Sequence, residues 1–302
     1  MTAVTTDAAT TADGARRRTD AARRPGPRRG LPSVRKIALV GGAYLIALIF
    51  ITPYLEMFLT ALRPVKEGAD PTIIPKHFEW SNFTSVFSGD SSFGTNMRIT
   101  LEVAFGATFL VLLVALPAAY YTARKKFRGR KLFLALVLVT QMFQPTAMVI
   151  GIYGEMRDLG MINSVWALIM VDAGFNLAFA VWILSAYFAA IPVELEQAAM
   201  IDGATRFGAF RRVTIPLAMP GIVTALIFTF IAAWNEFIVA LTLTTSPDKA
   251  PLSVAVDNYI GQYTVDYGHL FASTVIATIP VIVLFGLIER KVVDGLTAGS
   301  IK

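Results

Sequence analysis

Residues 165–190 read VWALIMVDAGFNLAFAVWILSAYFAA, an apolar run that contains a single charged side chain, Asp172. At about 1.5 Å of rise per residue, a helix of this length exceeds the hydrocarbon thickness of a bilayer, which is about 30 Å. Ionisable residues inside such a span are costly, so Asp172 is also a candidate functional group. The run predicts a transmembrane helix. Other runs of similar length and composition in the chain would predict further transmembrane helices.

Five further runs of this kind occur, and together they predict an all-α membrane protein with six transmembrane helices. The six predicted spans are Ile37–Leu62, Ile99–Tyr121, Leu132–Tyr153, Val165–Ala190, Leu217–Leu243 and Leu270–Val293. The composition agrees, because 55% of the 302 residues are apolar and 16% are charged, with a mean hydropathy of +0.60. One soluble core of this length could not bury so much apolar surface, so membrane lipid is the expected solvent.

Several classes of function are disfavoured by residue usage. The chain has no cysteine, which excludes disulfides, zinc–thiolate sites and thiol nucleophiles. Its two histidines, His77 and His269, lie far apart in sequence, so no metal site is predicted. The net charge of +6 does not indicate nucleic-acid binding, because the basic residues stand at the ends of the apolar runs.

Lysine and arginine are concentrated in alternate connections between the spans. They are frequent before the first span, in the loops 122–131 and 191–216 and at the C-terminus, and sparse in the loops 63–98 and 244–269. The positive-inside rule predicts a multi-pass protein of the cytoplasmic membrane with both termini cytoplasmic and the latter two loops external. Proline and aromatic residues in the first external loop predict a cap or a short interfacial helix.

Residues 1–35 are rich in Ala, Thr and Arg and poor in large apolar side chains. They predict a disordered basic cytoplasmic tail before a transmembrane domain of residues 36–302. Arg28 and Arg29 precede an apolar run, as they would in a twin-arginine export signal. That run is too long for a signal and has no convincing A-x-A cleavage site after it, so it predicts an uncleaved first span.

The loop between the fourth and fifth predicted spans reads IPVELEQAAMIDGATRFGAFRRVTIP over residues 191–216. A helix is predicted first, with a stripe of small and apolar side chains at helical spacing: Leu195, Ala198, Ala199 and Asp202. Glu196 offers a charged anchor, and Gly203 is where the helix would end or bend. A second amphipathic piece follows, with Phe207 and Phe210 on one side. The pattern predicts a short helix that a partner can bind closely, and the alternative is a helix lying on lipid headgroups.

The motif Glu196-x-Ala198-Ala199, Asp202-Gly203, nine residues and Val213-x-Ile215-Pro216 resembles the EAA loop of permease subunits in binding-protein-dependent ABC importers. The valine and isoleucine of the last element are conservative departures from the family pattern. Three other stretches resemble the MalG-like branch, which imports carbohydrates: residues 118–130, Trp234–Phe237 and Gly295–Lys302. The likeness covers roughly residues 35–302 and leaves out only the basic tail.

The resemblance implies that this loop is a coupling helix that docks in a cleft of an ATPase subunit. Glu196 would pair with a basic residue there, Gly203 would permit the sharp turn, and the apolar stripe would fill the cleft. The residues implied in coupling are Glu196, Ala198, Ala199, Asp202, Gly203, Phe207 and Phe210. The implied partners are a homologous second permease subunit, two ATP-binding subunits and an external solute-binding protein.

The chain contains no G-x-x-x-x-G-K-[ST] phosphate loop. It is therefore predicted to be a transport subunit without an ATPase site, not an enzyme, and to bind no cofactor itself. ATP and Mg would be bound by the partner ATPase subunits.

Within the fifth span, Trp234-Asn235-Glu236-Phe237 combines hydrogen-bonding groups with aromatic faces, as sugar sites do. The candidate substrate path comprises Trp234, Asn235, Glu236, Phe237, Gln144 and Asn176. The alternative is that Asn235 and Glu236 pair with the second permease subunit.

The predicted function is that of a permease subunit of an ATP-driven ABC importer for a mono- or oligosaccharide, and a non-sugar solute is the nearest alternative. An ion-gradient-driven secondary transporter is the alternative of a different class, and it would need inverted repeats or broken helices around a midplane ion site. No inverted repeat is evident in the sequence, and that alternative leaves the loop 191–216 unexplained.

Overall fold

The computed structural model describes residues 34–64, 75–88, 93–125, 127–261 and 263–298. The predicted basic tail therefore lies, up to residue 33, outside the described residues. The chain divides into two units, residues 1–52 and 53–302, and helix α1 (Val34–Ala61) crosses the boundary between them. The described parts are helical, and their one β-contact is an isolated bridge between Ile260 and Val265.

Four helices are long and apolar enough to cross a membrane alone. They are α1, α3 (Phe93–Arg124), α6 (Val165–Ala190) and α13 (Tyr267–Ala298). Two bent sets reach the same length only when each is counted as one span: α4 (Arg130–Thr140) with α5 (Pro145–Asp158), and α8 (Arg206–Ala209), η2 (Phe210–Thr214) and α9 (Ile215–Leu217) with α10 (Met219–Trp234). The described residues thus hold four to six candidate spans.

The third predicted span is not one continuous helix. Its two parts, α4 and α5, meet at an angle of 90°, and the break falls between Thr140 and Pro145. Gln144 has an extended backbone, with φ −77° and ψ 139°, because a residue before proline is displaced from the helical region. Pro145 opens α5 at a position where its missing N–H costs nothing, so it does not lie in mid-helix as a continuous span would require.

The fifth predicted span, Leu217–Leu243, is also interrupted. Helix α10 ends at Trp234, and a separate short helix, α11 (Ile238–Leu243), begins four residues later. The carboxylate of Glu236 accepts hydrogen bonds from the backbone N–H groups of Val239 (2.8 Å) and Ala240 (2.9 Å). It thereby caps the first turn of α11, where N–H groups have no partner within the helix.

The connecting segments opposite the loop 191–216 are more helical than predicted. Helix α3 begins at Phe93 rather than Ile99, and α2 (Ser81–Ser85) is the short helix expected in the loop 63–98. The loop 244–269 contains the 3-10 turn η3 (Pro247–Lys249) and α12 (Leu252–Asp257), and α13 begins within it at Tyr267. Ser85 of α2 lies 2.8 Å from Nε2 of His269, which ties α2 to α13.

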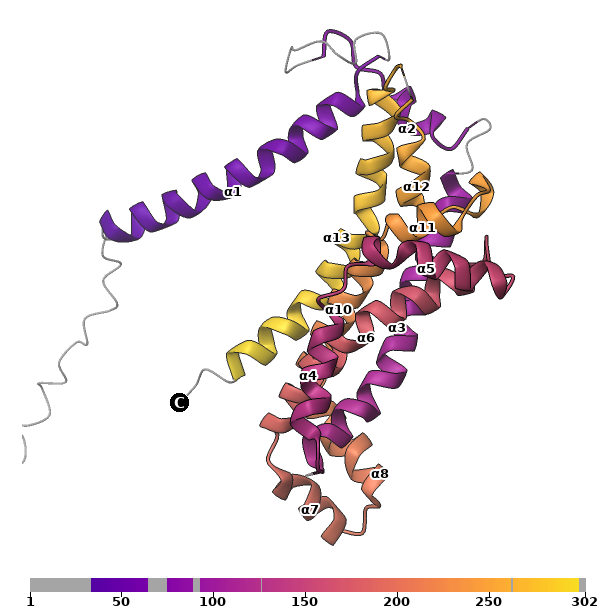
Figure 1. Cartoon of the computed structure of the whole chain (residues 1–302). Coiled ribbons are helices and arrows are strands. Elements are labelled where there is room, and N and C mark those ends of the chain that lie inside the picture. Colours follow the sequence, from indigo (N-terminus) through magenta and orange to yellow (C-terminus); the bar gives the residue numbers. More distant parts are fainter. Residues whose placement is uncertain (1–33, 65–74, 89–92, 126, 262, 299–302) are drawn as a thin grey trace, which may run out of the picture. The chain divides into compact units, whose positions relative to one another are not determined.

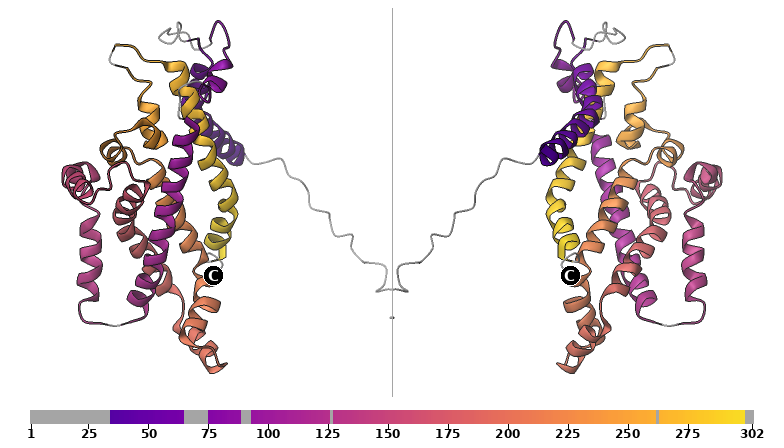
Figure 2. Two further views of the ribbon diagram at one scale, coloured as in Figure 1. Left: turned by 90° about the vertical axis from the view of Figure 1, so that its right-hand side faces the viewer. Right: turned by 90° about the vertical axis from the view of Figure 1, so that its left-hand side faces the viewer.

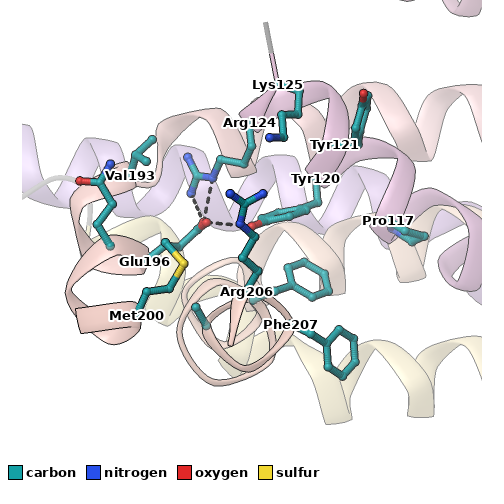
Figure 3. Close-up of a pocket in the computed structure, with 13 residues that line it drawn as sticks. Pro117, Tyr120, Tyr121, Arg124, Lys125, Val193, Glu196, Met200, Arg206 and Phe207 are labelled. Atoms are coloured by element: carbon teal, nitrogen blue, oxygen red, sulfur yellow. Dashed lines mark hydrogen bonds and ion pairs between the residues drawn. The ribbon is translucent and has the colours of Figure 1, made fainter. Parts of the chain in front are cut away.

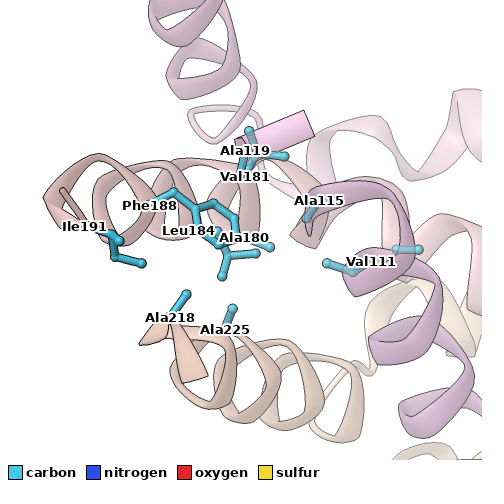
Figure 4. Packing of buried hydrophobic residues seen from close by; sticks show 11 residues of the cluster. Val111, Ala115, Ala119, Ala180, Val181, Leu184, Phe188, Ile191, Ala218 and Ala225 are labelled. Carbon is cyan, nitrogen blue, oxygen red and sulfur yellow. The ribbon is translucent and has the colours of Figure 1, made fainter. Parts of the chain in front are cut away.

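The core of residues 53–302 lies where α3, α6 and α10 pack against one another (Figure 4). Alanines occupy the contacts, including Ala115 and Ala119 of α3, Ala180 of α6 and Ala225 of α10, all fully buried. Small side chains let membrane helices approach closely, so this core fixes their relative positions. Figures 1 and 2 show that it carries α7 (Val193–Ile201) and α8 at one end and α2 at the other.

Candidate functional site

Helix α7 and the turn after it form the first half of the loop predicted to be functional. The backbone of Gly203 is left-handed, with φ +91°. The N–H of Ala204 donates to the carbonyl of Ala199 (3.0 Å), and the N–H of Gly203 donates to that of Met200 (3.1 Å). These two bonds make a Schellman motif, in which glycine is favoured because L side chains disfavour positive φ. The sharp turn predicted at Gly203 is therefore present.

Glu196 points from α7 into the protein and is only 6% exposed. Its Oε1 accepts hydrogen bonds from Nε of Arg124 (2.8 Å) and from the hydroxyl of Thr214 (2.7 Å), and its Oε2 accepts one from the hydroxyl of Tyr120 (2.8 Å). Nη2 of Arg124 lies 2.6 Å from Oε1, and both side chains are more than nine-tenths buried. Figure 3 shows Glu196 with Arg124 and Tyr120. Together with Thr214, these residues join α3, α7 and the end of η2.

These contacts change the interpretation of Glu196. An anchor for a basic residue of another subunit needs a carboxylate that faces outward, and this carboxylate is already bound on both oxygens within its own chain. Arg124 also donates from Nη1 to the carbonyl of Ile191 (2.8 Å), at the junction of α6 and α7. Within this chain Glu196 holds α7 against α3. Its pairing with a basic residue of an ATPase subunit stays a prediction.

The outer face of the loop exposes apolar side chains. Ile201 is 86% exposed, Phe207 is 72% exposed and Leu195 is 44% exposed. Among the other residues predicted to couple, Ala198, Asp202 and Gly203 are exposed, whereas Ala199 and Phe210 are partly buried. Phe210 packs on the ring of Tyr120, with 4.5 Å between ring centroids. The predicted set is thus divided between an exposed face and an inner face that fixes the loop.

Sequence reasoning missed Arg124, Tyr120 and Thr214 as members of this site. Arg124 and Tyr120 lie more than 70 residues before Glu196, so no local spacing relates them to it. A usable signal was present, because a buried acidic residue requires a partner and the basic end of α3 is the obvious source. Both residues also fall within the stretch 118–130 that resembles the MalG-like branch.

A pocket of about 590 Å³ lies between α3, α7 and α8 beside this cluster (Figure 3). It is called the loop pocket below and is lined by Pro117, Tyr121, Lys125, Met200, Arg206 and Phe207, among others. Arg124 and Glu196 form part of its wall, and Arg206 extends toward Tyr120.

The candidate substrate-path residues do not meet in one cavity. Trp234 and Asn235 line a cavity of about 180 Å³ with Thr100 and Ser253, whereas Glu236 lines a separate space of about 10 Å³ together with Asp172. Trp234 is 6% exposed. The side chain of Asn235 donates to the carbonyl of Ile231 at 2.9 Å, within its own chain.

The remaining candidates have local roles in the structure. The amide of Asn176 donates to the backbone carbonyl of Asp172 (2.9 Å), and Gln144 is the exposed residue that precedes α5. Phe237 precedes α11 and packs against the apolar cluster that contains Val239. Among the described residues, no group of three or more acidic or histidine side chains is placed to hold a metal ion.

The fold and the loop together define a class: polytopic helical membrane proteins with an internally braced helical loop at one end. The chain belongs to the family of binding-protein-dependent transport system inner membrane components, whose family model matches residues 111–296. That match includes the complete loop and α3 from Val111 onward.

Named relatives align with more than four-fifths of the chain. The trehalose transport system permease protein SugB of Mycobacterium tuberculosis is 35% identical over 83% of this chain and 92% of its own length. The diacetylchitobiose uptake system permease protein DasC of Streptomyces coelicolor is 34% identical over 85% of this chain and 93% of its own length. The trehalose/maltose transport system permease protein MalG of Thermococcus litoralis is 30% identical over 89% of this chain and 98% of its own length.

A solved structure shares the fold. It is a bacterial ABC transporter involved in the import of the acidic polysaccharide alginate, and one of its chains superposes with a TM-score of 0.70. The alignment covers 86% of this chain and 98% of the other at 22% identity. The resemblance in sequence to the ABC importer permeases is therefore matched by a resemblance in fold.

Proposed function

We propose that the chain is a permease subunit of an ATP-driven importer that carries a mono- or oligosaccharide across the cytoplasmic membrane. The observation that carries this proposal is the braced loop with an exposed apolar face, in a chain of the binding-protein-dependent transport family. The substrate class rests on relatives named for trehalose, diacetylchitobiose and trehalose/maltose transport. The chain has no phosphate loop, so ATP and Mg would be bound by partner ATPase subunits.

Six spans are the best interpretation of the helices. The ends of α3 and α6 both lie at the loop, because Arg124 bonds to Glu196 and to the carbonyl of Ile191. The chain between them must therefore return to the opposite end, which makes α4 and α5 one crossing. By the same reasoning α10 and α11 form one crossing, because α13 begins beside α2 at that opposite end.

The distribution of charge supports a cytoplasmic position for the loop. The end of the bundle that carries α7 also carries the basic residues that follow α3, and the positive-inside rule places such an end in the cytoplasm. With six spans, both termini would then be cytoplasmic. We expect the exposed face of Leu195, Ala198, Ile201 and Phe207 to dock on an ATPase subunit, with a second permease subunit and an external solute-binding protein completing the importer.

The substrate path is proposed to include Trp234 and Asn235, because they line a cavity with polar neighbours. Glu236 has two proposed roles besides capping α11: contact with the sugar, or pairing with the second permease subunit. Replacement of Glu236 by Gln distinguishes these two roles. A glutamine offers one side-chain acceptor in place of two, so we expect faster hydrogen exchange at Val239 or Ala240 whichever role is correct. Altered sugar affinity of an assembled importer would favour the solute role, and loss of the partner permease would favour the interface role.

The function is tested by reconstituting the chain in vesicles with its permease partner, ATPase subunits and binding protein. We expect uptake of the sugar held by the binding protein to require ATP and to vanish when the ATPase subunits are omitted. An ion-gradient-driven carrier would instead need broken helices around an ion site, and broken helices are present here. Uptake by the purified chain alone, driven by an ion gradient, would establish that alternative and refute the importer.

A further inference from the structure

The loop pocket has a composition that neither the braced loop nor the transport path explains. Its volume of about 590 Å³ is within the range of sites for small organic ligands, which is about 300–1,000 Å³. Pro117, Val193, Met200 and Phe207 supply apolar wall, and the wall as a whole is mostly apolar. It is formed by α3, a membrane-length helix, together with the loop that follows α6.

The charges that line the pocket do not balance. Arg124, Lys125 and Arg206 contribute three positive charges, whereas Glu196 is the one carboxylate among the described residues that line it. Arg124 is matched by Glu196 at 2.6 Å. Lys125 and Arg206, both exposed, therefore leave a surplus of positive charge at the polar end of a mostly apolar pocket.

The pocket also has a direction relative to the membrane. Its lining runs along α3 from Arg124 and Lys125 at the basic end back to Pro117, which is seven residues or about 10 Å along the helix axis. Tyr121 lies between these levels and is 55% exposed, as is typical of aromatic residues at the membrane interface. The cations thus lie at the expected headgroup level and the apolar wall at the level of the first acyl carbons.

We propose that the loop pocket binds an anionic phospholipid, with its phosphate between Lys125 and Arg206 and the upper part of an acyl chain along Pro117. Basic pockets at the cytoplasmic ends of membrane helices are suited to anionic headgroups. A free phosphate ion would leave the apolar wall unfilled, so a lipid fits the whole pocket. The placement in the cytoplasmic leaflet rests on the proposed function and orientation. Bound lipid would bridge α3 and α8 and steady the loop that couples to ATP hydrolysis.

The test compares two double variants with the same change of charge. Lys125→Gln with Arg206→Gln removes both pocket cations, whereas Arg211→Gln with Arg212→Gln removes two exposed arginines of the same loop that do not line the pocket. The full chain is purified in detergent, and binding of phosphatidylglycerol is measured against phosphatidylcholine by native mass spectrometry. We expect the pocket variant to lose about tenfold or more in phosphatidylglycerol affinity and the control to stay within about twofold.

Every other result of the binding measurement contradicts the proposal. Equal losses in both variants would indicate attraction to the basic surface in general, and no loss in either would exclude the pocket. Competition by inorganic phosphate as strong as that by phosphatidylglycerol would identify a free-anion site. Lipid binding is measured without transport, so a chain that binds phosphatidylglycerol at the pocket but imports nothing would refute the proposed function and leave this inference intact.

Discussion

Arg124, which the motif does not include, uses all three guanidinium nitrogens at the loop. It pairs with Glu196 and also bonds to the carbonyl of Ile191, so it holds both α7 and the end of α6. Breaking a buried ion pair by removing one partner costs about 3–5 kcal/mol, because the other charge is left buried without compensation. The residue that braces the loop is thus a different residue from those that form its exposed face.

Replacement of Arg124 by Gln should therefore destabilise the protein by about 3 kcal/mol or more and release the loop. Thermal unfolding in detergent and protease cleavage between residues 191 and 216 measure the two effects. Arg128→Gln is the matched control, because Arg128 is an exposed arginine in the neighbouring connection. Exchange of the two charges, Arg124→Glu with Glu196→Arg, should restore part of the stability. Unchanged stability of the single variant would show that the ion pair does not brace the loop.

Gly203 allows the backbone effect of a substitution to be separated from the effect of charge. A Cβ atom added there would meet no atom within 4 Å, but the φ of +91° disfavours most side chains. Asn and Asp tolerate positive φ similarly and differ in charge. We expect Gly203→Asn to retain most ATP-dependent uptake. Gly203→Asp should lose ATPase subunits or hydrolyse ATP without import, because its carboxylate would be buried without a partner in the interface with the ATPase subunit. Such an unpaired buried charge costs several kcal/mol.

The control for this series is Gly154→Ala in α5, where the added Cβ also meets no atom within 4 Å and the backbone is helical. It should leave uptake unchanged. Normal uptake by a stably expressed Gly203→Asp protein would contradict the assignment of this face to ATPase docking. The loop would then be better described as lying on the membrane surface.

At the scale of elements, the two phenylalanines of the second amphipathic piece provide a matched pair. Phe207 is 72% exposed, whereas Phe210 is partly buried and packs on Tyr120 and Phe188. Phe207→Ala should leave the unfolding temperature unchanged, because the ring is exposed. It should weaken binding of the ATPase subunit about tenfold to a hundredfold, because we expect the ring to be buried in that partner. Phe210→Ala should instead lower stability by on the order of 2 kcal/mol. Equal effects of both variants on stability would contradict this division.

How far each element could be predicted depended on local signals. Helix α6 has the predicted bounds, Val165–Ala190, because the proline at 192 holds Ile191 in an extended conformation with ψ 124°. The third and fifth spans were predicted as continuous helices because hydropathy averaged over a whole span does not reveal where a helix is interrupted. The break after α10 depends on Glu236 binding two backbone N–H groups, a contact that no periodicity reveals. The turn at Gly203 was predictable, whereas the Arg124 contact required the tertiary fold.

At the scale of the whole molecule, the core of α3, α6 and α10 links the loop rigidly to the opposite end of the bundle. The alanines at their contacts allow close packing, and close-packed helices transmit displacement better than loosely packed ones. A shift of α7 would therefore reach α3 through Arg124 and Tyr120, and reach α10 through Thr214 and η2. The orientation of the bundle decides whether ATP can drive such a shift.

That orientation can be measured directly, because the chain has no cysteine to give background labelling. Ser88 follows α2 and Ile201 ends α7, and both side chains are exposed near opposite ends of residues 53–302. Ser88→Cys should react with an impermeant thiol reagent in intact cells, and Ile201→Cys should react only after the membrane is permeabilised. The Ile201 variant in permeabilised cells is the control for reactivity. Labelling of Ile201→Cys in intact cells would place the loop outside, where ATPase subunits cannot reach it, and the coupling assignment would fail with the orientation.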